Sequence, residues 1–145
     1  CGFFMESTMK ETTRLQLLDI PFYTVFTKHD YDKLNDQMED GFKLGYDASD
    51  APAFALLVAG GFSSILVVFI DSDDPWIRKC TRDELYSICI HESTHVMQYY
   101  TRLIDDETRM MEFEACFMQF ITKVIWDAMV QSHQFPVLGR AKKKK

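Results

Sequence analysis

The chain has 145 residues, a length that suits one domain with a single hydrophobic core. Hydrophobic residues make up 47% of it and aromatic residues 14%, which argues against global disorder. The net charge of −6 argues against a general nucleic-acid-binding protein, because contacts with phosphates need clustered lysine and arginine side chains.

The first part of the sequence predicts a strand and a helix after an irregular start. Residues 1–12 are expected to form a loose N-terminal segment. Residues 15–26 are rich in β-branched and aromatic residues and predict a strand, in which Pro21 indicates an edge position or a break. Residues 30–42 predict a short polar helix that ends at Gly41.

The segment APAFALLVAGGFSSILVVFI, residues 51–70, contains no charged residue and has the length of a membrane span. A Gly-Gly pair and a Ser-Ser pair interrupt it in the middle, and its second half is rich in β-branched residues. Two buried strands joined by a tight turn account for these features better than a membrane helix does. We therefore predict a hairpin over 53–70, followed by a turn over 71–76, and membrane association is not expected.

Two long helices are predicted in the second half of the chain. The first, over about 82–103, begins with the capping box TRDE, in which Thr81 and Glu84 satisfy free backbone N–H groups at the helix start. The second helix, over about 109–130, follows the polar stretch DDET. Residues 136–145 end in RAKKKK and predict a basic, solvated tail.

The first of these helices carries HESTH, residues 91–95, which has the spacing of a zinc site. Residues four apart lie on one face of an α-helix, so the imidazoles of His91 and His95 can bind the same ion. Glu92 points aside from this pair, where it can take a proton from a zinc-activated water as general base. The alternative is an amphipathic helix with two partly buried histidines, and the five residues alone favour the two interpretations equally. The position after a predicted strand and before a second helix with carboxylates favours zinc.

A catalytic zinc with two histidine ligands needs a third protein ligand and keeps one position open. Glu112 and Glu114 both lie in the second helix, but two residues apart they diverge by roughly 200° and do not both face the metal. Glu114 lies about 60° from the centre of the predicted apolar stripe, where a charged group needs a partner. Glu112 lies on the side expected to face solvent, so we predict Glu114 as the ligand and keep Glu112 as the alternative. The predicted stripe consists of Phe113, Phe117, Phe120, Ile121, Val124 and Ala128.

HESTH, followed after a short turn by a helix that contains EFEA, resembles the zincin metallopeptidases, in particular the glutamate-liganded branch that includes thermolysin. The run DSDDPW…IHESTHVMQYY…DDETRMMEFEACFMQFI is also similar to small zincin-like proteins encoded in bacteriophage genomes, and the resemblance covers roughly residues 64–125. It implies that His91, His95 and Glu114 hold zinc and that Glu92 is the general base. Some zincin families use the earlier position of an E-x-x-A pattern, which corresponds to Glu112.

The resemblance has two further implications. Many zincins place an aspartate four residues after the ligand glutamate, but Met118 follows Glu114 and Cys116 follows Glu112 at that distance, so support for a ligand histidine must come from elsewhere. In zincins, an edge strand beside the active-site helix pairs with an extended peptide substrate, and residues 63–70 are expected to be that strand. A wholly buried strand is an equal alternative, because this segment does not alternate.

The four cysteines show no paired spacing, which argues against a disulfide framework and predicts a reducing compartment such as the cytoplasm. The resemblance to phage-encoded proteins implies the host cytoplasm or the virion. Cys89 and Cys116 lie inside apolar runs and are expected in the core. The first ten residues lack the basic start and apolar stretch of a secretory signal.

Together these features predict a single α+β domain of minimal zincin type over residues 13–135, in which a short sheet or hairpin packs on the two long helices and zinc lies between them. The expected function is zinc-dependent hydrolysis of peptide bonds in a peptide or protein substrate, such as a virion or host protein. The alternative is a phage-associated structural or interaction protein, in which a zincin scaffold binds zinc with little or no turnover.

Overall fold

The structure is a computed structural model that describes residues 8–15, 19–38, 44, 51–60, 63–104 and 111–139. It combines one sheet with helices on both faces, which confirms the predicted α+β class. The elements, in chain order, are β1 (Thr13–Leu15), β2 (Ile20–Val25), α1 (Lys28–Asp36), β3 (Ala53–Gly60), β4 (Ser63–Ile70), α2 (Pro75–Lys79), α3 (Arg82–Ile104), α4 (Met111–Ser132) and a 3₁₀ helix (Pro136–Leu138).

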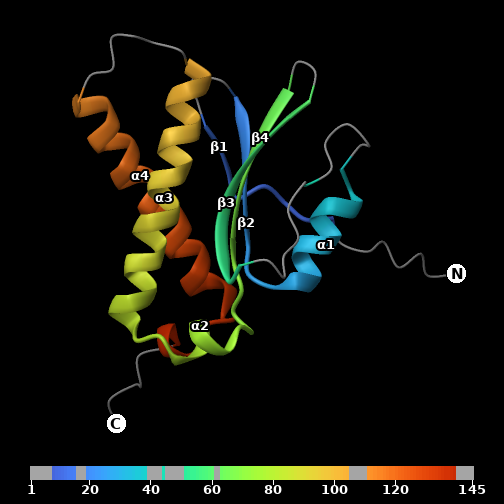
Figure 1. The fold of residues 1–145 in the computed structure, drawn as a ribbon, viewed down its shortest axis with the longest axis vertical. Coiled ribbons are helices and arrows are strands. Elements are labelled where there is room, and N and C mark those ends of the chain that lie inside the picture. Colours follow the sequence, from blue (N-terminus) through green and yellow to red (C-terminus); the bar gives the residue numbers. More distant parts are fainter. Residues whose placement is uncertain are drawn as a thin grey trace, which may run out of the picture.

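The four strands form one mixed sheet in the order β1-β2-β4-β3 (Figure 1). β3 and β4 pair antiparallel along their whole length, from Ala53 opposite Ile70 to Gly60 opposite Ser63. The hairpin predicted over 53–70 is therefore confirmed, and the alternative of a membrane helix in this segment is wrong. Within the described residues, no helix is long and apolar enough to cross a membrane.

β4 lies between β2 and β3 and is buried on both faces. Its residues alternate between the two faces of the sheet. Leu66, Val68 and Ile70 belong to the core under α3 and α4. Ile65, Val67 and Phe69 belong to a smaller cluster under α1. Figure 1 shows α3 and α4 on one side of the sheet and α1 on the other. Of the two expectations for residues 63–70, the edge strand is wrong and the wholly buried strand is confirmed, because burial on both faces explains the continuous apolar run. The edge strand against which α3 packs is β3.

β2 is an interior strand, parallel to β4, although it contains a proline. The break that Pro21 predicted falls just before the strand, at Asp19, whose φ is 51°. Pairing with β4 begins at Phe22, opposite Leu66. Pro21 is therefore not opposite a β4 residue. Its missing backbone N–H removes no hydrogen bond between β2 and β4.

α1 and α3 begin close to the positions that the sequence predicts. The side-chain oxygen of Thr27 accepts the backbone N–H of Asp30 at 3.0 Å, so α1 begins earlier than predicted and ends at Asp36. Gly41, the predicted end of this helix, lies outside the described residues. α3 confirms the helix predicted over 82–103, and Glu84 donates its backbone N–H to Thr81 Oγ1 at 3.2 Å, as the capping box predicted.

α4 confirms the second predicted helix, but its buried stripe differs from the predicted one. Phe120, expected in the stripe, is 47% exposed, and Cys116, expected in the core, is exposed as well. The helix carries apolar residues almost all round, so periodicity alone did not fix the face that packs on the sheet and on α3. The buried stripe runs through Phe117, Ile121, Ile125 and Met129.

Both ends of the described chain pack on the domain. Met9 donates its backbone N–H to the side chain of Gln37 and accepts a hydrogen bond from the same side chain. At the other end, the ring of Phe135 lies 5.3 Å from that of Phe26, centroid to centroid, and Leu138 is buried. The packed domain thus continues past residue 135, its predicted end.

Candidate metal centre on α3

His91 and His95 lie one turn apart on α3, and their rings meet edge to face. Their Nε2 atoms are 3.1 Å apart, and their ring centroids are 4.8 Å apart. Two bonds of about 2.0–2.1 Å to one tetrahedral zinc ion place the two ligand atoms about 3.4 Å apart. A small opening of the pair would therefore suffice for both imidazoles to hold the same ion.

Gln98 supports the second histidine from one turn further along α3. Its side-chain oxygen Oε1 lies 3.2 Å from Nδ1 of His95. When Nδ1 carries the proton and donates it to this oxygen, Nε2 of His95 is left unprotonated and free to bind a metal. Many zincins orient a ligand histidine with an aspartate that follows the ligand glutamate, and this chain has no aspartate there. Gln98 on α3 can orient His95 instead.

Replacing Gln98 by alanine is expected to weaken zinc binding about 10–100-fold, because the ring of His95 then loses the hydrogen bond that fixes its tautomer and orientation. The affinity is measured by competition with a chromophoric chelator. Gln98→Glu is the matched control, since a carboxylate accepts the same hydrogen bond and should retain the affinity. Equal affinities of Gln98→Ala and the wild type would show that this bond has no role in metal binding.

Glu92, beside the first histidine in the sequence, is buried and only 3% exposed. Its Oε2 is the one buried side-chain polar atom, among the described residues, that has no hydrogen-bond partner. Burial raises the pKa of Glu92 to about 7, and the charge of the neighbouring His95 partly opposes this shift. A carboxyl group that titrates near neutral pH and has a free oxygen is suited to accept a proton and release it again.

The burial of Glu92 also predicts how the stability of the metal-free protein depends on pH. The pKa is about 7 in the folded chain and 4.5 ordinarily, so from pH 4.5 upward the unfolded state ionises first and the free energy of unfolding falls. Above about pH 7 the loss reaches about 2–3 kcal/mol. Glu92→Gln has no such group, so its stability relative to the wild type should rise by this amount between pH 4.5 and pH 8. Denaturant unfolding in the presence of a chelator measures this difference, and parallel pH profiles of the two proteins would contradict the expectation.

His91 and Glu92 line a groove of about 480 Å³ between α3, α2 and the start of β3. The other residues that line it are Pro52, Ala53, Trp76, Glu84, Ser87 and Ile88. Because one wall of this groove is the start of an edge strand, an extended chain that pairs with β3 can reach the histidine pair.

The histidine pair faces away from α4. α3 contacts α4 through Tyr86, whose ring centroid lies 5.1 Å from that of Trp126, and through Cys89, whose Sγ lies 3.4 Å from the backbone oxygen of Thr122. Successive residues of a helix turn by about 100°, so the two histidines lie roughly 140–180° round α3 from Tyr86. The candidate site therefore lies on the β3 and α2 side of α3, and not between the two long helices as the sequence predicted.

Glu114, the predicted third ligand, lies on α4 seven residues before Ile121 and continues the buried stripe of that helix, where it is half-buried. Within the described residues, no group of three or more His, Cys, Asp and Glu side chains is gathered so that it could hold a metal ion. Glu114 is thus not brought to the histidine pair. Glu112 lies in the first turn of α4, and its side chain is outside the description. The identity of the third ligand stays a prediction.

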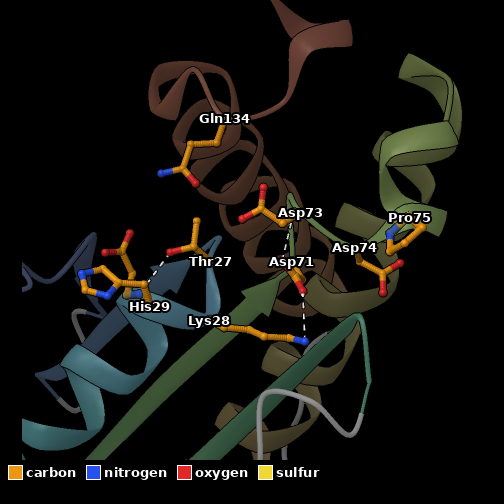
Figure 2. A pocket seen from close by; sticks show the side chains of 9 residues that line it. Thr27, Lys28, His29, Asp71, Asp73, Asp74, Pro75 and Gln134 are labelled. Carbon is orange, nitrogen blue, oxygen red and sulfur yellow. Dashed lines mark hydrogen bonds and ion pairs between the residues drawn. The ribbon is translucent and has the colours of Figure 1, made fainter.

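A second hollow, of about 490 Å³, lies at the carboxyl ends of the parallel strands β2 and β4 (Figure 2). Asp71, which follows β4, is buried, accepts the backbone N–H of Asp73 at 3.0 Å and lies 4.0 Å from Nζ of Lys28. Asp74 accepts the N–H of Trp76 and caps α2. Both carboxylates accept backbone N–H groups of the segment 71–76, which was predicted as a turn. They therefore stabilise the local backbone, and we assign no ligand to this hollow.

No protein-family model, curated protein or solved structure matches this chain. The structure gathers three of the four predicted site residues, His91, Glu92 and His95, on two turns of α3. Sequence reasoning missed two contributors, Gln98 and Trp76. The spacing of three residues from His95 to Gln98 was a usable signal, because such residues are neighbours on a helix surface. The place of Trp76 was not readable, because it depends on how α2 folds against β3.

Proposed function

We propose that this chain is a zinc-dependent peptidase of zincin type, in which His91 and His95 hold the ion and Glu92 is the general base. The observation that carries the proposal is a pair of Nε2 atoms 3.1 Å apart beside a buried carboxylate with an unpartnered oxygen. A histidine pair in an ordinary amphipathic helix does not need such a carboxylate. Burying an unpartnered Glu92 oxygen costs free energy, and groups of this kind mark functional sites.

Each residue of the proposed site has one task. Zinc, when bound, supplies a Lewis acid that polarises the scissile carbonyl and acidifies water. His91 and His95 present Nε2 to the ion, and Gln98 keeps His95 in the required tautomer. The carboxylate of Glu92 accepts a proton from the attacking water and then delivers it to the nitrogen of the leaving amine. Glu114 stays the predicted third ligand, and it would have to move to the histidine pair when zinc binds, because α4 packs on the other side of α3.

A second candidate function is a zinc-binding structural or interaction protein with little turnover. It is favoured by one observation: the described residues bring no carboxylate to the histidine pair as a third ligand, so the three-ligand set of a catalytic zinc is not assembled there. A purely structural zinc has four protein ligands and needs no general base, so the buried Glu92 favours the peptidase.

The proposed function predicts peptide hydrolysis that depends on the metal. The zinc-loaded chain should cleave peptides in an unstructured protein such as reduced casein, the chelated chain should not, and zinc but not magnesium should restore cleavage. Mass spectrometry of the products measures both the cleavage and its positions. Cleavage that persists in the chelator would contradict zinc chemistry. Complete absence of cleavage by a chain that holds zinc would favour the second candidate.

A further inference from the structure

The groove beside the histidine pair has apolar walls along most of its length. Its apolar lining comes from Pro52 and Ala53 at the start of β3, Trp76 on α2 and Ile88 on α3. Trp76 is 56% exposed, which is unusual for a large aromatic side chain. An exposed tryptophan in a groove with apolar walls is suited to pack against a long side chain of a bound molecule.

The two ends of the groove carry different chemistry. His91 and the unpartnered carboxylate of Glu92 lie at one end, and the exposed carboxylate of Glu84 lies at the other. Glu84 precedes His91 by seven residues, which is about 10 Å along the axis of α3. One oxygen of Glu84 lies 3.3 Å from Thr81 Oγ1, so the carboxylate is held at the start of the helix. Of the described residues that line the groove, none is a lysine or an arginine, so the far end is negative.

We propose that this groove receives the side chain of a lysine or arginine next to the scissile bond of a peptide substrate; this inference rests on the proposed function. The peptide backbone then lies at the histidine pair, and the aliphatic part of the basic side chain packs against Ile88 and Pro52. Its charged end reaches Glu84 and the face of Trp76. Long basic side chains combine an apolar stem with a charged tip, which matches apolar walls that end at a carboxylate and an aromatic ring.

The test compares four blocked hexapeptides that differ at one position: lysine, arginine, glutamate, or norleucine, which has nearly the length of lysine without its charge. They are titrated into the zinc-loaded Glu92→Gln variant of the 145-residue chain, in which the proposed general base is absent, and tryptophan fluorescence reports binding near Trp76. The lysine and arginine peptides should bind about five- to tenfold more tightly than the norleucine peptide, and the glutamate peptide should bind most weakly.

Two further variants separate the groove from general electrostatics. In Glu84→Gln, on the same background, the preference for lysine over norleucine should fall below about twofold. Asp83→Asn is the matched control, because it removes the same charge from the same helix turn at a residue that does not line the groove, and it should keep the preference. Glu84→Gln retains the cap at Thr81, since the backbone N–H of Glu84 makes that bond. Equal binding of the lysine and norleucine peptides, or an unchanged preference in Glu84→Gln, would overturn the inference.

Cleavage by the wild-type chain is measured with the same four peptides, so that the two proposals fail separately. Cleavage without any preference for a basic residue would overturn the assignment of the groove and leave the peptidase proposal standing. A binding preference that depends on Glu84, with no cleavage of any peptide, would support the groove and overturn the peptidase.

Discussion

The wild-type chain is expected to bind one zinc ion per molecule, and His95→Ala is expected to lose it. The two Nε2 atoms are the part of the site whose geometry fits zinc most directly, at 3.1 Å from each other. Removing one of them leaves a single imidazole, which holds an ion far less tightly than a chelating pair. The loss of affinity should exceed the about 100-fold change expected from removing a supporting residue such as Gln98. Elemental analysis of the purified protein and chelator competition measure stoichiometry and affinity.

The same experiment identifies the third ligand. If Glu114 moves to the ion when zinc binds, Glu114→Ala should weaken zinc binding and Glu112→Ala should not, because only a ligand contributes affinity. The reverse result would assign the role to Glu112, the alternative that the E-x-x-A pattern allows. If the purified wild-type chain contains no zinc and binds none on titration, the proposed metal site is wrong, and His91 and His95 are ordinary residues of α3.

Glu92→Gln is expected to lower kcat about 10²- to 10⁴-fold while zinc stays bound, which is the effect of removing a general base. Glutamine has nearly the same size and keeps an oxygen, but it does not accept the proton of an attacking water. Hydrolysis of a peptide that the wild type cleaves, measured beside the zinc content, separates this loss from a loss of metal. Asp83→Asn on the first turn of α3 is the control for charge and should retain full activity. Full activity of Glu92→Gln would assign the base to another group.

The sequence predicted local features of the fold better than features set by packing. The hairpin over 53–70 and the start of α3 depend on glycine, serine and capping residues within a few positions, and both are confirmed. The helix α2 was predicted only as a turn, although Asp74 followed by Pro75 is a usual start of a helix, with a capping side chain and a proline at the first position.

The errors concern which face of an element is buried and which strand lies at the edge. For β4 an edge strand and a buried strand were equal alternatives, and the sequence did not decide between them, because pairing of β4 with the distant β2 cannot be read from local residues. Phe120 on α4 was placed in the predicted apolar stripe but is exposed, whereas Ile125 and Met129 are buried. Periodicity alone did not identify the buried stripe of a helix that is apolar nearly all round.

The candidate site was predictable to the extent that it lies within two turns of one helix. The helical repeat itself places His91 and His95 next to each other, so their spacing in the sequence predicted that the two imidazoles are neighbours. In the structure their Nε2 atoms lie 3.1 Å apart. The groove was not predictable, because Pro52, Trp76 and Ile88 come from three elements that meet only in the folded chain. The same limitation applies to Glu114, which lies on a different helix.

The arrangement of β2 next to β4 has a consequence for how the chain folds. β3 and β4 are adjacent in the sequence, so only a short connection separates the residues that pair. Phe22 on β2 pairs with Leu66 on β4, and α1 and the whole of β3 lie between these two residues in the sequence. Closing the longer connection costs more entropy, and parallel pairing over a large separation is slow. We therefore expect the hairpin to form first and β2 to join it late. Until β2 joins, the apolar strand β4 has an open edge on which a second chain can pair, so aggregation during refolding should increase steeply with protein concentration.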